Sequence, residues 1–245
     1  MDTSIHNPLK VVLHGYGKMG QLLEERLTAR GHRIIARIDT QADRADSTAW
    51  DTSLCAGADV CIDFSVTDAA GDALRHAVME GIPVITGTTG WQEHLDEWRS
   101  FVTVQSGTWV YGANFSIGMQ IFQHIVAIAA QRGVHFNYDI AGFELHHRAK
   151  KDAPSGTAHL LRRVIADAAD GYSTEFASTR CGSIPGTHTV LLDSEHDTIE
   201  LVHRARNRVG FADGAVWAAE QVNAVEGVWS FEDMVRHSIT REEIV

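Results

Sequence analysis

The sequence predicts an α/β protein in which a doubly wound parallel sheet is followed by a smaller α+β region. Three observations predict this class. Short apolar runs alternate with helical patterns through the first half, which is typical of parallel sheets. A glycine-rich turn, Gly15–Gly20, joins the first apolar run to the first helical pattern. Late in the chain, two alternating stretches flank Ser194–His196, which indicates an antiparallel hairpin.

The composition narrows the class of protein. With 245 residues, 44% of them hydrophobic, the chain can fill one large or two small domains. A formal net charge of -11 argues against nucleic-acid binding, which depends on a basic face. No apolar run approaches the roughly 20 residues that cross a bilayer, and Met1–Pro8 lacks the apolar core of a signal peptide. The 3 cysteines form no Cys-x-x-Cys pair. We expect a cytoplasmic protein without nucleic-acid or membrane partners.

The first predicted elements surround a dinucleotide-binding fingerprint. Lys10–His14 is predicted as a buried strand, an amphipathic helix ends near Gly31, and Arg33–Asp39 is the next strand. The G-x-G-x-x-G pattern lies between a strand and a helix, with an acid about 20 residues past the last glycine, as in the Rossmann fold. This context predicts a Rossmann-type N-terminal domain.

Each fingerprint position has a physical role. Gly15 allows the tight turn, Gly17 lets the backbone approach a pyrophosphate, and Gly20 lets helix and strand pack closely. Asp39 can accept a hydrogen bond from a ribose hydroxyl, and its charge repels a 2′-phosphate, which favours NADH. Thr40 is not a cation, but Arg37 and Arg44 keep NADPH open. The candidate cofactor-binding residues here are Gly15, Tyr16, Gly17, Lys18, Met19, Gly20 and Asp39.

Further alternation extends the predicted sheet. Strands are expected over 58–65 and 83–87, a helix over 69–80, and one or two short strands between 103 and 112. Small or polar residues follow three of these strands, where ligands of such sheets bind, although each could also be an ordinary turn. The candidates for lining a nicotinamide pocket are Ser65, Gly87, Thr88, Thr89, Ala113, Asn114, Phe115 and Ser116.

The second half changes pattern. A long apolar helix is expected over 117–132, capped by Ser116, and a strand over 139–146. A further helix is expected from 158 to about 170, and a last helix over 211–227. The hairpin strands are 187–193 and 197–204.

The segment Glu144–Thr157 concentrates chemistry in an acidic chain. His146, His147, Arg148, Lys150 and Lys151 crowd cationic groups together, which suits a small polyanion. The run turns into Ser-Gly-Thr before a helical pattern, and free N–H groups at a helix start bind carboxylates. A solvated basic turn with an ordinary helix cap remains the alternative.

Taken together, the motifs resemble the dihydrodipicolinate reductase family over nearly the whole chain. The segments that carry the resemblance are Gly15–Gly20, Ile62–Ser65, Gly87–Gly90, Ala113–Gly118, Glu144–Arg148 with Lys150, Asp152–Thr157, Gly182–Gly186 with His188, and Phe211–Ala215. The resemblance implies a dinucleotide-binding domain over 1–113, a substrate-binding and tetramerisation domain over 114–209, and a segment 210–245 that returns to the first domain. It also implies a homotetramer and NAD(P)H-dependent reduction of a cyclic dicarboxylate to tetrahydrodipicolinate, in lysine and diaminopimelate biosynthesis.

The resemblance also implies residue roles. His146 is the expected acid/base residue and Lys150 the expected proton donor. The expected ligands of the substrate carboxylates are His147, Lys150, Ser155, Gly156 and Thr157. Two positions depart from the family pattern. His14 stands where many members have glycine, so it either crowds the cofactor or closes the strand, and Ala149 stands where many have histidine.

Other readings compete with this one. Another Rossmann oxidoreductase, acting on an amino acid or a semialdehyde, explains the first half but not the basic segment. A dinucleotide sensor without catalysis needs no proton donor, so Lys150→Ala would leave its behaviour intact. We expect no metal site at His146 and His147, because neighbouring residues of a strand point to opposite faces.

Overall fold

The computed structural model describes residues 7–41 and 43–242, with side chains up to residue 239. Residues 1–6, most of the N-terminal segment considered above, lie outside the described part, as do 42 and 243–245. The chain divides into two compact units, which we describe separately: unit 1 comprises 1–116 and 209–245, and unit 2 comprises 117–208. Among the described residues, no helix has both the length and the apolar character to span a membrane.

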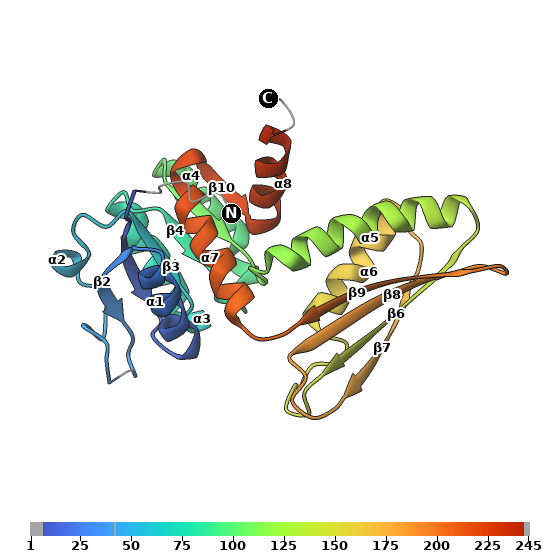
Figure 1. The fold of residues 1–245 in the computed structure, drawn as a ribbon. Helices are drawn as coiled ribbons and strands as arrows, with labels where there is room; N and C mark the ends of the chain where they lie inside the picture. Colours follow the sequence, from blue (N-terminus) through green and yellow to red (C-terminus); the bar gives the residue numbers. More distant parts are fainter. Residues whose placement is uncertain (1–6, 42, 243–245) are drawn as a thin grey trace. The chain divides into compact units, whose positions relative to one another are not determined.

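Unit 1 contains a six-stranded, fully parallel sheet (Figure 1). Its strands are β1 (Lys10–His14), β2 (Arg33–Ile38), β3 (Val60–Asp63), β4 (Val84–Thr86), β5 (Thr108–Tyr111) and β10 (Gly227–Ser230). They lie in the order β10-β5-β4-β3-β1-β2, so the direction of winding reverses between β1 and β3. Right-handed crossovers on either side of that reversal place helices on both faces. The predicted doubly wound sheet is confirmed.

The helices of unit 1 include elements that were not predicted. They are α1 (Lys18–Ala29), α2 (Thr52–Cys55), α3 (Thr67–Met79), η1 (Gln92–His94), α4 (Leu95–Val104), α7 (Val209–Gln221), η2 (Val222–Ala224) and α8 (Phe231–Glu242). Of the one or two short strands expected between 103 and 112, one is present, β5. Thr103 and Val104 instead end α4, whose Trp98 and Val102 are buried at helical spacing. The last helix is wrong at its end: α7 stops at Gln221, and β10 and α8 follow.

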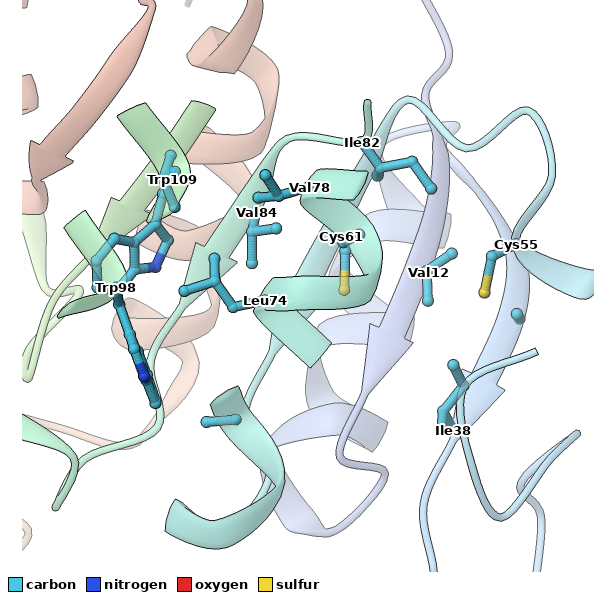
Figure 2. Packing of buried hydrophobic residues seen from close by; sticks show 14 of the residues in the cluster. Val12, Ile38, Cys55, Cys61, Leu74, Val78, Ile82, Val84, Trp98 and Trp109 are labelled. Carbon is cyan, nitrogen blue, oxygen red and sulfur yellow. The ribbon is translucent and has the colours of Figure 1, made fainter. Parts of the chain in front are cut away.

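One face of the unit 1 sheet packs under α3 and α4. Val12, Cys61, Val84 and Trp109 are neighbours across four strands, and all belong to one buried cluster (Figure 2). Leu74 and Val78 of α3 and Trp98 of α4 cover this row. Burial raises the pKa of the Cys55 thiol in the same cluster to about 11, so this cysteine stays protonated.

Unit 2 is a four-stranded mixed sheet with two helices (Figure 1). Its elements are α5 (Ile117–His135), β6 (Asp139–His146), α6 (Gly156–Ala168), β7 (Glu175–Arg180), β8 (Gly186–Asp193) and β9 (Thr198–Ala205). The strand order is β7-β6-β8-β9, and the antiparallel pairing of β8 with β9 confirms the predicted hairpin. β7 was not predicted and runs parallel to β6. Residues of α5 and α6, among them Val126 and Leu161, share a buried cluster with the sheet residues Ile140 and Val190.

Candidate active site

A cavity of about 680 Å³ opens in unit 1 at the carboxyl ends of β1, β2 and β3. This is the edge where the winding reverses, and open parallel sheets bind their ligands there. The cavity is lined by His14, Gly15, Tyr16, Gly17, Gln21, Ile38, Asp39, Thr40, Gln41, Asp43, Arg44, Thr48, Phe64, Ser65, Val66 and Ala69. The fingerprint loop, the segment after β2 and the segment after β3 therefore meet at one place.

The glycines of the loop leave space where a dinucleotide needs it. Gly15 has φ +86°, and a Cβ there would lie 2.4 Å from the Phe64 carbonyl oxygen. A Cβ on Gly20 would lie 2.2 Å from the Gly15 oxygen, so this glycine permits close packing of loop and helix. A Cβ on Gly17 would meet nothing within 4 Å. Gly17 also precedes α1, whose start has neither a side-chain cap nor an acid in its first turn, so its N–H groups suit a phosphate.

Asp39 anchors the second wall of the cavity. Its Oδ2 accepts from the Tyr16 N–H at 2.6 Å, and its Oδ1 accepts from the Gln41 N–H at 2.8 Å. The carboxylate therefore ties the loop after β1 to the segment after β2. The Arg37 guanidinium is bound by two carboxylates. Its Nε donates to Glu24 at 3.0 Å, and its Nη1 donates to Asp46 at 3.2 Å.

His14, which departs from the family pattern, is the last residue of β1 and lines the cavity. Its ring contacts the carboxylate of Asp63. Its Nδ1 lies 2.9 Å from Oδ1 of the fully buried Asp63, which is its register neighbour on β3. The Ser65 hydroxyl donates to the same oxygen at 2.5 Å. His14 thus joins the ends of the two strands at the winding reversal.

A second cavity in unit 1, of about 390 Å³, adjoins the loop after β4. It is lined by Met19, Phe64, Ser65, Val66, Thr67, Gly87, Thr88 and Thr89. The Trp91 Nε1–H donates to the Thr88 carbonyl at 2.6 Å, and the Thr67 hydroxyl donates to the Thr89 carbonyl at 2.9 Å. Phe64 and Ser65 line both cavities, so the two spaces share a wall.

Other predicted cofactor residues do not line either cavity. Lys18 and Gly20 belong to α1 and are absent from both linings. The segment Ala113–Ser116 follows β5 and is likewise absent from them. Phe115 is buried, with its ring 4.5 Å from that of Phe231, which gives it a packing role.

In unit 2, the register of the sheet gathers a buried polar cluster. Glu144 on β6 lies opposite Ser178 on β7 and opposite His188 on β8. His146, two residues further along β6, shares the face of Glu144 and lies opposite Arg180. Glu144, His146 and His188 are all buried. The carboxylate accepts from Ser178 Oγ at 2.9 Å and from Arg180 Nη2 at 3.0 Å.

The cluster holds one negative and one positive charge, with neutral imidazoles. Burial pushes the pKa of Glu144 upward, but hydrogen bonds from Ser155, Ser178 and Arg180 outweigh it and hold the pKa at about 2. Burial lowers the pKa of His188 to about 4, with the neighbouring His146 adding to the effect. Burial is also the largest cause of the lowered pKa of His146. Both imidazoles are therefore neutral at pH 7.

The segment after β6 carries the remaining predicted residues. The Lys150 ammonium lies 2.8 Å from an Asp152 carboxylate oxygen, and His147 is half-buried nearby in sequence. Ser155 caps α6, since its Oγ accepts from the Ala158 N–H at 3.2 Å. Its hydroxyl points inward, to Glu144, whereas Gly156 is exposed with open space where a Cβ would be.

Three members of the cluster also have the donor types of a metal site. One ligand atom each from Glu144, His146 and His188 lies within 4.8 Å of the other two. Arg180, however, already neutralises this carboxylate, and a divalent ion there would face its guanidinium. The donor set fits a hydrogen-bonded network better than a cation.

Both halves of the chain match one family. Residues 9–115 match the model of the dihydrodipicolinate reductase N-terminus, and residues 118–235 match that of the C-terminus. The chain belongs to the dihydrodipicolinate reductase family. A 4-hydroxy-tetrahydrodipicolinate reductase of Christiangramia forsetii is 34% identical over 93% of this chain and 98% of its own. One from Zymomonas mobilis is 35% identical over 84% and 89%.

Solved structures of this reductase family and beyond share the fold. The dipicolinate-bound dihydrodipicolinate reductase from Paenisporosarcina sp. TG-14 has a TM-score of 0.79 at 21% identity, covering 92% of this chain and 99% of that one. A probable dehydrogenase from Thermotoga maritima has a TM-score of 0.65 at 11% identity, covering 93% of both chains. The predicted family, the Rossmann-type fold and the oxidoreductase class are confirmed, and a nicotinamide dinucleotide is the cofactor class.

The sequence did not assign roles to several residues that the structure brings together. Glu144 and His188 stood within quoted motifs, and Ser178 and Arg180 lie on the strand that was not predicted. A signal was present, because Phe176, Ser178 and Arg180 alternate along β7 and share one face. A charged residue that shares a strand face with an apolar residue such as Phe176 indicates a partner elsewhere in the chain.

Proposed function

We propose that this member of the family is a 4-hydroxy-tetrahydrodipicolinate reductase. It reduces the cyclic dicarboxylate formed from pyruvate and aspartate semialdehyde to tetrahydrodipicolinate, in lysine and diaminopimelate biosynthesis. The observation that carries the proposal is in unit 2: buried His146 ends β6, and Lys150 and the exposed start of α6 follow within ten residues. Proton-transfer groups and carboxylate anchors thus occupy one short segment.

The cavities of unit 1 fit a nicotinamide dinucleotide. The loop Gly15–Gly20 and the start of α1 would hold the pyrophosphate, and Asp39 would hold a ribose hydroxyl. Met19, Ser65 and Gly87–Thr89 line the smaller cavity and would receive the nicotinamide end. The bound cofactor supplies the hydride for the reduction.

We infer that NADH is preferred over NADPH. The Asp39 carboxylate lines the cavity where a 2′-phosphate would have to fit, and like charges repel. Arg37 is held by Glu24 and Asp46, and its guanidinium lies 5.7 Å from the Tyr16 ring centroid. Arg44 also lines the cavity, but Asp39 and Asp43 line it too, so carboxylates outnumber guanidinium groups there.

In unit 2, we assign proton transfer to His146 and Lys150. The Lys150 ammonium pairs with Asp152 in this structure, and an anionic substrate would compete for it. His147, Lys150, Gly156 and Thr157 hold the substrate carboxylates. Ser155 supports them by fixing the start of α6, because its own hydroxyl is committed to Glu144.

We further propose that unit 2 mediates a homotetramer of a cytoplasmic enzyme. Ile121, Ile125 and Ile128 are spaced along one face of α5 and are 45–50% exposed. Exposed apolar stripes of this kind mark association surfaces. Light scattering on the purified chain tests the tetramer, and a monomeric mass at micromolar concentration would contradict it.

The reductase activity is tested by supplying the unstable substrate in place. The preceding enzyme of the pathway condenses pyruvate with aspartate semialdehyde, and nicotinamide absorbance at 340 nm is followed with NADH and NADPH in parallel. We expect oxidation that depends on both precursors, with one equivalent of tetrahydrodipicolinate formed per cofactor. A folded protein that binds NADH but oxidises none of it would refute the proposal and favour a sensor or another dehydrogenase.

A further inference from the structure

Glu144 is a charged residue at a position where charge is costly. Its side chain is fully buried on the helix-covered face of β6. Such a carboxylate is tolerated only with near-complete hydrogen bonding. Its Oε1 accepts from the Ser155 N–H at 3.0 Å, in addition to Ser178 and Arg180. This oxygen therefore accepts three hydrogen bonds from two segments of unit 2, the turn before α6 and β7.

The contacts around Glu144 Oε2 show where the hydroxyl proton of Ser155 and the ring proton of His188 lie. The Ser155 hydroxyl donates its only proton to Oε2. Ser155 Oγ must then act as the acceptor toward His188 Nε2, 3.2 Å away, as it does toward the Ala158 N–H. Since the neutral His188 ring carries one proton, that proton is on Nε2. Its Nδ1 is buried without a hydrogen-bond partner among the described residues.

The same oxygen determines the tautomer of His146. His146 Nδ1 is buried and lies 3.5 Å from Glu144 Oε2, and no hydrogen-bond partner is found for it in the described part of the chain. A lone pair on Nδ1 would face the carboxylate and be repelled, whereas an N–H would be attracted. The proton of the neutral ring therefore resides on Nδ1, and Nε2 is the basic nitrogen.

Nε2 of His146 lies close to the backbone of Gly186. Gly186 begins β8, and a Cβ there would lie 3.0 Å from this nitrogen. Any larger residue at 186 would crowd the atom that must meet a substrate. The glycine thus complements the orientation that Glu144 sets.

Several charged groups act on His146 from neighbouring elements. Burial is the largest influence and lowers its pKa, Glu144 and Asp152 raise it, and Lys150 and Arg180 lower it. The His188 ring, 5.1 Å away between centroids, is neutral. Glu144 is the nearest carboxylate and the main counterweight to burial.

We propose that Glu144 is a positioning residue that fixes the His146 proton on Nδ1 and directs Nε2 to the substrate, while the same carboxylate holds the Ser155 turn. This inference rests on the proposed function for its catalytic consequence. One buried carboxylate thereby links the proton-transfer residue to the start of α6, where a substrate carboxylate binds. Glu144 acts on Ser155 through hydrogen bonds and on His146 through its charge, so loss of the charge alters the His146 tautomer without removing the ring.

The direct test is ¹⁵N NMR of the full chain with labelled histidine. The His146 signals are assigned from their loss in His146→Gln. We expect a protonated Nδ1 and an unprotonated Nε2 at pH 7 in the unmodified protein. A predominant Nε2–H form in that spectrum would overturn the proposal even if no variant folds.

Glu144→Gln then removes the charge and keeps the shape. We expect a mixture of tautomers and a lower His146 pKa, because the carboxylate that raises this pKa has lost its charge, with the acidic limb of kcat/KM moving in the same direction. Ser178→Ala is the matched control, because it removes one hydrogen bond from Glu144 and keeps the charge. The proposal fails if both variants change His146 alike, or if neither does.

The two proposals fail separately. The tautomer is read without turnover, so an inactive protein with the expected His146 spectrum refutes the reductase activity alone. Bound NADH, read from fluorescence, reports whether unit 1 of each variant is folded.

Discussion

The candidate sites of the two units differ in the groups that form them. The cavity of unit 1 depends on backbone and on missing side chains, with Gly15, Gly17 and Gly20 leaving room and Asp39 as a carboxylate of its wall. The site of unit 2 depends on buried charge, with Glu144 and Arg180 balanced inside a sheet. A backbone site follows from local spacing and tolerates little added volume. A buried charge network depends on distant strands and responds to pH.

The largest effect is expected from His146→Gln in unit 2. General acid–base groups contribute roughly 10²–10⁴-fold to rate, so turnover should fall by about that factor. NADH affinity should not change, because His146 belongs to unit 2 and the cavities belong to unit 1. The measurement is kcat in the coupled assay beside NADH fluorescence titration. His203→Gln, on β9 of the same sheet, is the control and should keep most of the activity.

Unit 1 should respond instead to added volume. Gly20→Ala places a methyl 2.2 Å from the Gly15 oxygen, which should cost about 1–3 kcal/mol of unfolding free energy. Gly17→Ala meets nothing within 4 Å, so it should fold normally and weaken NADH binding only. Urea unfolding followed by tryptophan fluorescence reads unit 1, because all 6 tryptophans lie there. Equal stability losses in the two variants would contradict this packing.

Lowering the pH should decrease the stability of unit 2, because the buried His188 resists protonation in the folded state. The pKa of His188 is about 4 in the fold against an ordinary value of 6.5, so its contribution is complete above pH 6.5. As the pH falls from 6.5 toward 4, this contribution to the free energy of unfolding is lost, and the loss is roughly 3 kcal/mol at most. Hydrogen exchange of β6 and β8 amides across this range measures the effect. His188→Asn should flatten the pH dependence, and an unchanged slope would show that another group is responsible.

The smallest effect is expected at the edge of the unit 1 cavity. Glu24→Gln weakens the hold on Arg37, whose charge then becomes available to a 2′-phosphate. NADPH affinity relative to NADH should rise a few-fold, since an ion pair near the surface, like this half-buried one, contributes about 1 kcal/mol. Paired fluorescence titrations measure the ratio, and adding Arg37→Gln should reverse the gain. A ratio that stays constant would mean that Glu24 has no part in selecting the cofactor.

The contrast between the units also explains what the sequence could predict. The strands around Gly15–Gly20 and the hairpin at Ser194–His196 depend on local spacing, and both were predicted correctly. α4 was missed because Val102, Thr103 and Val104 are β-branched and resemble a strand, although burial along the helix decides the outcome. β7 was missed because Glu175–Arg180 is largely polar, so its pattern carries little hydrophobic signal.

The site residues show the same contrast between features set by local sequence and features set by strand pairing. His146, Lys150 and the start of α6 could be named because they are close in sequence. The partners of Glu144 could not be named, because Ser178 and Arg180 reach it only through the pairing of β6 with β7. His14 could be singled out, but its bond to Asp63 depends on the pairing of β1 with β3.

The central claim is that unit 1 binds the cofactor and unit 2 transfers the proton. The substitution Lys150→Ala tests it most directly. Turnover in the coupled assay and the Kd of NADH are measured on the same preparation. The account predicts turnover at least 100-fold lower, within the range of general-acid contributions, and an NADH Kd within about twofold of the unmodified protein. Retained turnover, or a Kd that weakens in parallel with it, would contradict the assignment of cofactor binding to unit 1 and proton transfer to unit 2.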